Sequence, residues 1–254
     1  MTPPVASPPV EAADDAYWDG VAGQVDALPD GWRRHARRAH LALVERWVGQ
    51  PVGRWLKTDL FEEREPSRAL LGHLGAAQWV GADLARDTVR AAGIRPALTA
   101  DVRCLPVADE AFDGVLSTST LDHFDDPRSI DEALAELRRV LRADGRLVLT
   151  LDNPQNPLVR VRNALPHSVA RRTGLVPFAV GATLGLDDGA AALARAGFEV
   201  LDTATLLHAP HVVGTRLARF PTWEHRVLPR MDRAGETRIG RYTGHFVAFL
   251  CRPG

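Results

Sequence analysis

Acidic and hydroxyl-bearing residues recur where short apolar runs end, and these residue types could bind hydroxyl groups, amines or cations. Four apolar runs end on aspartate, at Asp59, Asp83, Asp101 and Asp152, and a fifth runs into STST at 117–120. Any one aspartate in such a place could simply cap a helix or shape a turn. Their repetition predicts a crevice in which several carboxylates converge along one edge of a sheet.

The elements that must position these residues alternate along the chain between residues 51 and 152. Candidate strands lie at 53–59, 77–83, 95–101, 112–118 and 145–152, and candidate helices at 66–74, 85–93 and 131–145. Alternation at this spacing predicts an α/β fold, a doubly wound and mostly parallel sheet covered on both faces. Ligands of such sheets bind beyond the carboxyl ends of the strands, where the aspartates lie.

The flanking segments predict a tail, a cover and two lid insertions. Residues 1–13 are rich in proline, alanine and acids and predict a disordered tail. Apolar residues recur at helical spacing over 14–50, broken by LPDGW, which predicts two helices as an N-terminal cover. The domain then spans 51–254, with lid insertions at about 153–185 and 209–242, and TGHFVAFLCRP as the final strand.

Composition excludes several classes of protein. The net charge of −1 and 25% charged residues argue against a nucleic-acid binder with a broad basic face. Two cysteines are too few for a disulfide framework or a cysteine-based zinc cluster, and we interpret both as small buried hydrophobes. The chain has neither a basic start followed by an apolar run nor about 18 uninterrupted apolar residues, so we expect a cytoplasmic location. The sequence does not indicate an oligomeric state.

The segments GADLARDTVRAA, TADVRCLPVADEAFDGVLSTSTLDHFDDP, ALAELRRVLRADGRLVLTLDNP and AGFEVLD occur in this order. In order and spacing they resemble the class I S-adenosylmethionine-dependent methyltransferases of the methyltransferase domain 11 type, over about residues 52–205. The resemblance implies a Rossmann-like sheet of about seven strands with an antiparallel last strand. It also implies S-adenosylmethionine as cofactor and a small molecule as methyl acceptor.

The resemblance assigns the adenosine side of a cofactor site. Asp83 would accept hydrogen bonds from the ribose hydroxyls, which suits a carboxylate because it can take two donors at once. Asp101 would receive the adenine amino group, with the backbone of Val102 at the ring edge and Leu84 packed on the ring face. Thr118 and Ser119 would lie near the methionine portion of the cofactor.

The loop after the first strand departs from the family, which has a GxGxG turn there. Asp59, Phe61 and Glu63 stand in the three glycine places. In one interpretation Asp59, Glu62 and Glu63 supply carboxylates that hold the ammonium group or complement the sulfonium charge of the cofactor. In the other, the loop collapses, Phe61 fills the site and cofactor binding is lost.

Histidines provide the catalytic and metal hypotheses. His123, in TSTLDHF, could act as a general base near neutral pH, or could orient the loop. His208 and His211 could form part of a metal site, with Asp152 or an acid from the lid, but the sequence does not make a third ligand obvious, so we predict no metal. His35 and the neighbouring His40 fall on the basic amphipathic helix, where surface or cover roles are expected.

The first lid carries Arg160, Arg162, Arg171 and Arg172 and no acids between residues 155 and 185. Arginine binds carboxylates and phosphates, so these residues could contact an anionic acceptor or, through LVPFAVG, an anionic membrane surface. Alternatively, the arginines are simply solvated. Nucleic acid is disfavoured as a substrate, because no aromatic stacking platform accompanies the basic residues. The alternatives to a methyltransferase are a scaffolding relative without cofactor and an NAD-type oxidoreductase, which the missing GxGxxG disfavours.

Overall fold

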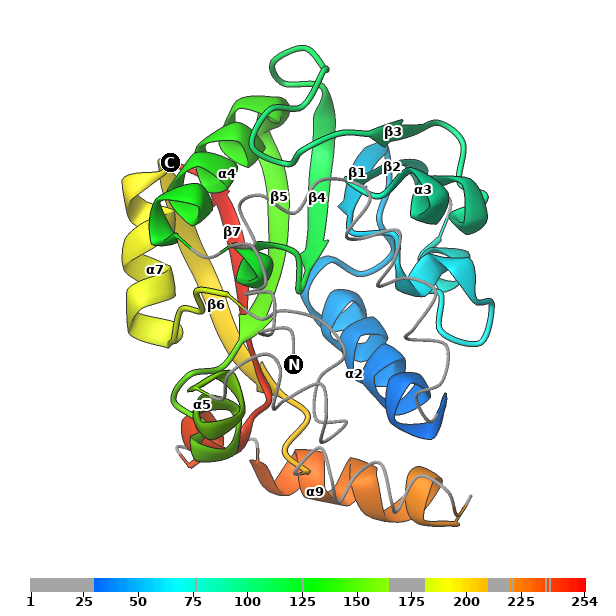
Figure 1. Ribbon diagram of the computed structural model, residues 1–254, viewed down its shortest axis with the longest axis vertical. Helices are drawn as coiled ribbons and strands as arrows, with labels where there is room; N and C mark the ends of the chain where they lie inside the picture. The colour runs from blue at the N-terminus through cyan, green and yellow to red at the C-terminus, as the bar shows by residue number, and fades with distance from the viewer. Residues whose placement is uncertain are drawn as a thin grey trace, which may run out of the picture.

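The computed structural model of the protein describes residues 30–75, 77–124, 126–164, 181–209, 220, 222–235, 237 and 239–254 (Figure 1). Its centre is a seven-stranded sheet in the order β3-β2-β1-β4-β5-β7-β6. The strands are β1 Arg54–Thr58, β2 Gln78–Asp83, β3 Ala97–Thr99, β4 Phe112–Thr118, β5 Leu141–Asp152, β6 Phe198–Leu206 and β7 Phe246–Pro253. The first five pair in parallel, and β7 runs antiparallel to β5 and β6. The predicted mostly parallel sheet with an antiparallel last strand is confirmed.

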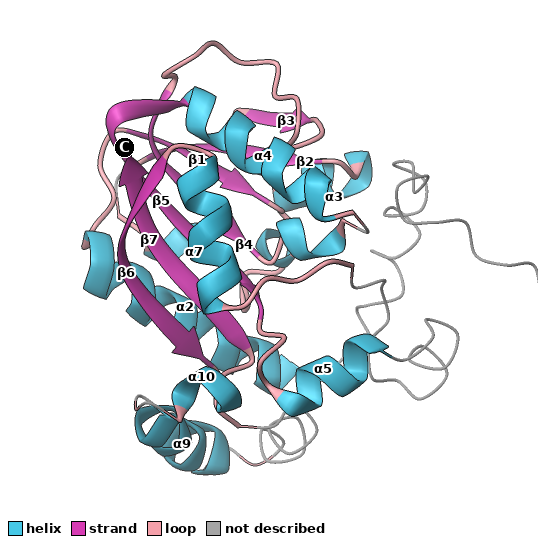
Figure 2. Cartoon of the chain, turned by 90° about the vertical axis from the view of Figure 1, so that its left-hand side faces the viewer, coloured by secondary structure: helices cyan, strands magenta, loops and turns pink. Residues whose placement is uncertain are grey.

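Helices cover both faces of this sheet. They are α2 Asp30–Val48, α3 Arg86–Ala92, α4 Pro127–Val140, α5 Pro157–Ala164, α7 Leu186–Arg195, α9 Leu228–Gly235 and α10 Gly240–Thr243. Short 3-10 turns lie at Glu62–Arg64, Leu71–His73 and Leu121–His123 (η2, η3 and η4), and a π-helical turn (η5, Trp223–Val227) precedes α9. Figure 2 shows α4 and α7 in front of the sheet and α2 behind it.

Alternation along β5 builds a separate core on each face. Leu147, Leu149 and Leu151 belong to the core that includes α4 and α7, whereas Val148 belongs to the core that includes α2. Because side chains alternate across a strand, a central strand that is buried on both sides must be apolar at nearly every position. This explains why the run RLVLTL reads as continuous rather than alternating.

Helix α2 is the described part of the N-terminal cover. Its Leu43 and Val44 are buried against the sheet, and Trp32 packs on Leu207 near its first turn. The indole Nε1 of Trp47 donates to Asp202 Oδ2 of β6 at 2.7 Å. The predicted tail, 1–13, and the first predicted helix lie outside the described residues.

Two predicted helices were wrong in extent. Residues 66–74 form bends and the turn η3, because the Glu63 carboxylate accepts the N–H groups of Leu70 and Leu71 that a helix would have used. The long helix predicted at 131–145 begins at Pro127, where Asp126 caps it by accepting from Arg128 N. It ends at Val140, and residues 141–144 extend β5 instead.

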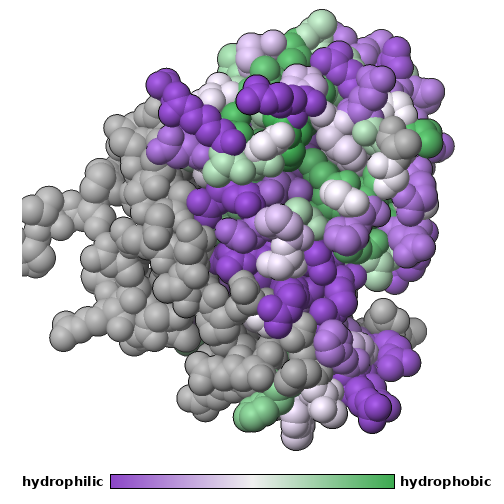
Figure 3. Space-filling view, turned by 90° about the vertical axis from the view of Figure 1, so that its right-hand side faces the viewer, coloured by the Kyte–Doolittle hydropathy of each residue, from purple (hydrophilic) through white to green (hydrophobic). Residues whose placement is uncertain are grey.

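The predicted lids are described in part. Helix α5 lies within the first, whose residues 165–180 fall outside the described ones, and η5 with α9 lies within the second. On the face in Figure 3, hydrophilic and hydrophobic side chains intermingle, as the nearly neutral composition suggests. Among the described helices, none combines the length and apolar content needed to cross a membrane.

Candidate cofactor and acceptor site

The strand order reverses direction at β1, which pairs with β2 on one side and β4 on the other. Hydroxyl groups meet at the carboxyl ends of β1 and β4. Thr58 Oγ1 lies 2.9 Å from Ser117 Oγ and 2.8 Å from Thr120 Oγ1. Ligands of doubly wound sheets bind at such a switch point, so these hydroxyls mark the centre of the candidate site.

Lys57, near the end of β1, joins the strands at this point. Its side chain is buried, and Nζ donates to Thr58 O at 2.5 Å, Asp59 O at 2.6 Å and Thr118 Oγ1 at 2.9 Å. An ammonium group has three donors, so all of them are used. Sequence reasoning missed this residue, although Lys57 is the sole lysine in a chain with 31 basic residues.

Asp59 keeps a glycine-like backbone at the first glycine place of the loop. Its φ is +60°, in the left-handed region, and its Oδ1 accepts a hydrogen bond from Phe61 N at 2.8 Å. Asp tolerates this region better than most residues because its short side chain can bond locally. The loop therefore turns without glycine, and Lys57 fixes the Asp59 carbonyl.

The two glutamates of the loop are engaged elsewhere. Glu62 Oε1 lies 3.1 Å from Arg33 Nη1 of α2, and burial raises the pKa of Glu62 while Arg33 opposes the rise. The Glu63 carboxylate is buried and accepts from Leu70 N and Leu71 N at 3.1 and 3.2 Å. The Glu63 carboxylate therefore supports the turn at Leu70 and Leu71, and the interpretation in which it holds the ammonium group stays a prediction.

Asp83 closes the loop onto β2. Its Oδ2 accepts from Leu60 N at 2.7 Å and its Oδ1 from Ala85 N at 2.8 Å. Burial, and next the nearby Asp59 carboxylate, raise the pKa of Asp83 to about 6. A carboxylate has about four acceptor positions, so lone pairs remain for hydroxyl donors. Leu84 follows, half-buried.

Asp101, after β3, is held by Arg103. It accepts from Arg103 N at 2.8 Å, Nη2 at 2.7 Å and Nε at 3.1 Å. Burial raises the pKa of Asp101, but the hydrogen bonds from Arg103 outweigh this and keep the pKa below its ordinary value. The guanidinium also lies 5.0 Å from the Phe124 ring, and Val102 is buried. Sequence reasoning missed Arg103, although it stands two residues from Asp101.

Thr118, Ser119 and His123 lie at the β4 end of the same edge. Thr118 accepts from Lys57, as described, and Ser119 adopts a positive φ of 48° with its N–H bonded to Thr150 O. His123 is half-buried in η4. Lys57 thus connects Asp59 with Thr118, because it donates to both residues. Leu60, next to Asp59 in the loop, connects this part of the site with Asp83.

A second polar cluster lies where β4 and β5 end. Asp122 Oδ2 accepts from Asp152 N at 3.1 Å, and Asp152 Oδ2 bonds to Arg162 Nη2 of α5. Asp152 Oδ1 lies 3.6 Å from His245 Nε2. Burial, and next the Asp152 charge, raise the pKa of Asp122 to about 6. The signal that could have found Asp122 is its place in the turn that follows β4.

The remaining histidines and cysteines correct several interpretations. His35 and His40 are buried on α2, which fits the expected cover role and not the surface role, and burial lowers the pKa of His40 to about 4. His208 Nδ1 bonds to Thr243 Oγ1 at 2.8 Å, whereas His211 lies outside the described residues. Within the described part of the chain, no group of three or more His, Cys, Asp or Glu residues could hold a metal ion. Cys104 is exposed, contrary to expectation.

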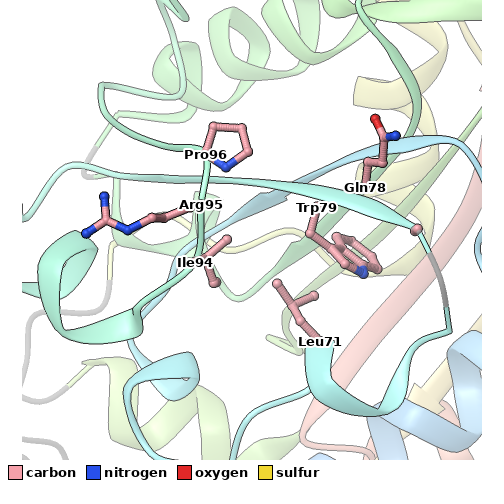
Figure 4. A pocket seen from close by; sticks show the side chains of 7 residues that line it. Leu71, Gln78, Trp79, Ile94, Arg95 and Pro96 are labelled. Carbon is pink, nitrogen blue, oxygen red and sulfur yellow. The ribbon is translucent and has the colours of Figure 1, made fainter.

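A pocket of about 520 Å³ lies at the opposite edge of the sheet (Figure 4). Trp79 and Gln78 at the start of β2 line it together with Ile94, Arg95 and Pro96 ahead of β3. These are the amino ends of the strands, away from the switch point. We therefore place the candidate site at the carboxyl edge and not in this pocket.

Comparison with known proteins bears on the family and the fold. Residues 65–149 match the protein family described as methyltransferase domain. These residues of the chain are thus similar to a methyltransferase domain. A curated relative, malonyl-[acyl-carrier protein] O-methyltransferase from Geobacter sulfurreducens, is 37% identical over 161 residues, which are 59% of this chain and 55% of the relative. The matched part of the chain thus spans about half the length of that relative.

Solved structures share the fold of this chain. An S-adenosylmethionine-dependent methyltransferase from Thermotoga maritima has a TM-score of 0.56 and 19% identity, covering 87% of this chain and 90% of the other. The 1,6-didemethyltoxoflavin-N1-methyltransferase of Burkholderia thailandensis, bound to S-adenosylhomocysteine, has a TM-score of 0.55 and 17% identity, covering 100% and 93%. The predicted fold and family are confirmed, and S-adenosylmethionine is the cofactor that this domain implies.

The groups at the carboxyl edge of the sheet fit this cofactor. Asp83 has acceptor positions left for two ribose hydroxyls after its backbone bonds are counted. The Asp59 turn retains the left-handed backbone that glycine would provide. The carboxylates of Asp59, Asp83 and Asp101 also suit a ligand that carries a cationic sulfur.

Proposed function

We propose that this protein transfers a methyl group from S-adenosylmethionine to a small-molecule acceptor at the carboxyl edge of the sheet. The observation that carries the proposal is the Asp83 carboxylate, fixed by two backbone N–H groups beside the left-handed Asp59 turn. Asp83 would thus offer its oxygens to the ribose hydroxyls beside a loop that still turns without glycine.

The adenosine would be held by Asp83 and the residues that follow β3. Asp83 would accept the ribose hydroxyls, and Leu84 and Val102 would flank the adenine. Asp101 would accept the adenine amino group with lone pairs that Arg103 leaves available. Arg103 holds the Asp101 carboxylate ionised and in one orientation, which favours a donor arriving from the ring.

The methionine portion would lie along the β1 and β4 ends. Asp59 would complement the ammonium group, while Thr118 and Ser119 would line the opposite side. Lys57 anchors both walls, because it bonds to the Asp59 carbonyl and to the Thr118 hydroxyl. We assign Lys57 a positioning role, since all its donors are already used.

The bound cofactor supplies a methyl group on a positively charged sulfur. The protein must then align the acceptor atom with that methyl group, and alignment alone can account for much of the rate increase. A proton acceptor is needed only if the acceptor atom carries a proton. His123, on the turn after β4, is the base that the sequence predicts.

The methyl acceptor would bind on the β5 side of the site. The arginines of the nearby helix α5 indicate which charge the acceptor carries. Arg160 of α5 is exposed, whereas Arg162 is paired with Asp152, and the other two lid arginines lie outside the described residues. We propose that an anionic group on the acceptor, away from the methylated atom, contacts Arg160. A KM for an anionic acceptor that is unchanged in Arg160→Ala would contradict this contact.

Calorimetric titration with S-adenosylhomocysteine tests the proposed function. We expect binding by wild type and about ten- to hundredfold weaker binding by Asp83→Asn, since a charged hydrogen-bond acceptor is lost. Asp87→Asn is the matched control, because Asp87 is an exposed acid on α3 nearby. Circular dichroism of each variant verifies folding.

The outcomes distinguish the alternatives. Absence of binding by folded wild type would overturn the methyltransferase proposal and favour a scaffolding relative without cofactor. Binding of NAD in a parallel titration, with none of S-adenosylhomocysteine, would favour an oxidoreductase instead.

A further inference from the structure

Asp122 lies one step along the sheet edge from the switch point. Its turn, η4, begins just after Thr120, whose hydroxyl lies 2.8 Å from Thr58 at the end of β1. Asp122 itself accepts from Asp152 N at the end of β5. It therefore lies on the side of the site away from Asp83, where a methyl acceptor would approach.

One oxygen of Asp122 has no hydrogen-bond partner. The residue is 2% exposed, and while Oδ2 accepts from Asp152 N at 3.1 Å, Oδ1 has no partner in the described part of the chain. Buried carboxylate oxygens are normally hydrogen-bonded, because leaving one unpaired carries a large desolvation penalty. An unpaired acceptor at a ligand edge indicates a donor that arrives with the ligand.

Four titratable or charged residues surround Asp122, and among them the His123 charge offsets part of the Asp122 charge. His123 is next to it on η4, Asp152 lies on β5, Arg162 on α5 and His245 just before β7. Arg162 donates to the Asp152 carboxylate, and its guanidinium lies 3.2 Å from His245 Nε2. The positive charge of Arg162 is therefore balanced by Asp152 and not by Asp122. Asp122 Oδ1 therefore remains able to accept a proton.

We propose that Asp122 Oδ1 accepts a hydrogen bond from the O–H or N–H group that is methylated and takes up its proton. This rests on the proposed function. The acceptor oxygen or nitrogen forms a bond to the methyl carbon as the carbon–sulfur bond breaks, sulfur keeps the electron pair, and the proton passes to Asp122. The substrate class is therefore an alcohol, a phenol or an N–H compound. A reacting carboxylate would place a second anion against Asp122.

Matched probes that differ only in the donor test this proposal. In the presence of S-adenosylhomocysteine, binding of phenol against anisole and of imidazole against 1-methylimidazole is measured by ligand-observed NMR at pH 8. We expect wild type and the control Asp131→Asn, a half-buried acid on α4, to bind the donor member of each pair at least about tenfold more tightly. Equal binding within both pairs, or no binding of any probe, would overturn the proposal.

Asp122→Asn should reverse the preference. Its amide oxygen must stay on Asp152 N, so its NH2 group faces the position of Oδ1 and offers a donor in place of an acceptor. The non-donor probes should then bind more tightly, with S-adenosylhomocysteine affinity unchanged. An unchanged preference for phenol in this variant would contradict the proposal.

A wild-type measurement keeps the test independent of how that variant folds. Phenol stays neutral between pH 5 and 8, so its advantage over anisole should shrink at pH 5, where Asp122 is protonated. A phenol advantage that is the same at both pH values would overturn the proposal. If wild type fails to bind S-adenosylhomocysteine, the proposed function itself fails, and that outcome is separate from a failure of the probe pairs.

Discussion

Asp59 shows how a single residue can take over a conformation usually left to glycine. Its φ of +60° would strain most side chains, and its Oδ1 offsets part of the strain by bonding to Phe61 N. The loop retains its turn but gains a carboxylate beside Asp83, which contributes to the raised pKa of Asp83. The change in residue type therefore alters the charge of the site more than its backbone.

We expect Asp59→Ala to be less stable than Asp59→Gly by about 1 kcal/mol, because alanine has neither the freedom of glycine nor the local hydrogen bond. The measurement is urea unfolding of both variants. Asp131 provides the control, because it lies within α4, where glycine should instead be less stable than alanine by a similar amount. The same order at both positions would argue against a strained turn at Asp59.

At the scale of elements, α2 is part of the fold and of the site. Its buried face packs on the sheet, and its Trp47 reaches β6. Its first turn supplies Arg33, which pairs with Glu62 and lies 5.2 Å from the Phe61 ring. The helix therefore packs on one face of the sheet and also contacts the loop that follows β1.

Leu43→Ala should lower the free energy of unfolding by about 2–4 kcal/mol, since Leu43 is buried between α2 and the sheet. Glu45→Ala, an exposed change on the same helix, should cost less than about 0.5 kcal/mol. Denaturant unfolding measures both. Similar small losses in the two variants would mean that α2 is only loosely docked.

The sequence predicted most elements and only part of the site. The strands were predictable because doubly buried strands read as apolar runs, and the polar edge because aspartates end them. The helix at 66–74 was wrong because helical spacing there competes with a carboxylate, Glu63, that takes its N–H groups. Lys57 was missed because its partner Thr118 is 61 residues away in the sequence. Asp122 was missed because its hydrogen bonding is set by Asp152 N at the end of β5, which only the folded structure brings next to it.

Across the whole molecule, the buried ionisable groups have opposite effects on how stability changes with pH. Burial raises the pKa of Asp83 and Asp122 to about 6, whereas it lowers the pKa of His40 to about 4. Between pH 4 and 6 the folded acids bind more protons than the unfolded chain, so their contribution to stability falls as pH rises. His40 binds fewer protons when folded, so its contribution rises with pH.

His40 is the same in wild type and in Asp122→Asn, so its contribution to the pH dependence cancels when the stabilities of the two proteins are compared. The ordinary pKa of aspartate, 3.8, lies below the folded value of about 6, so wild type loses stability as pH rises between them. We expect the variant to be more stable by about 1–3 kcal/mol at pH 7 and no more stable near pH 4. Thermal unfolding across this range measures the difference. Asp131→Asn should show no such trend, and a variant that is less stable at pH 7 would indicate a structural role for Asp122.

The position of β7 has a consequence for the order in which the fold assembles. β7 is the last strand in the sequence, yet it lies between β5 and β6 and pairs with both. During synthesis β6 has no neighbour to join until β7 has left the ribosome. The first five strands can pair as they emerge, whereas the far edge of the sheet must wait for residue 253. The β6 edge of the sheet therefore closes after the other strands have paired.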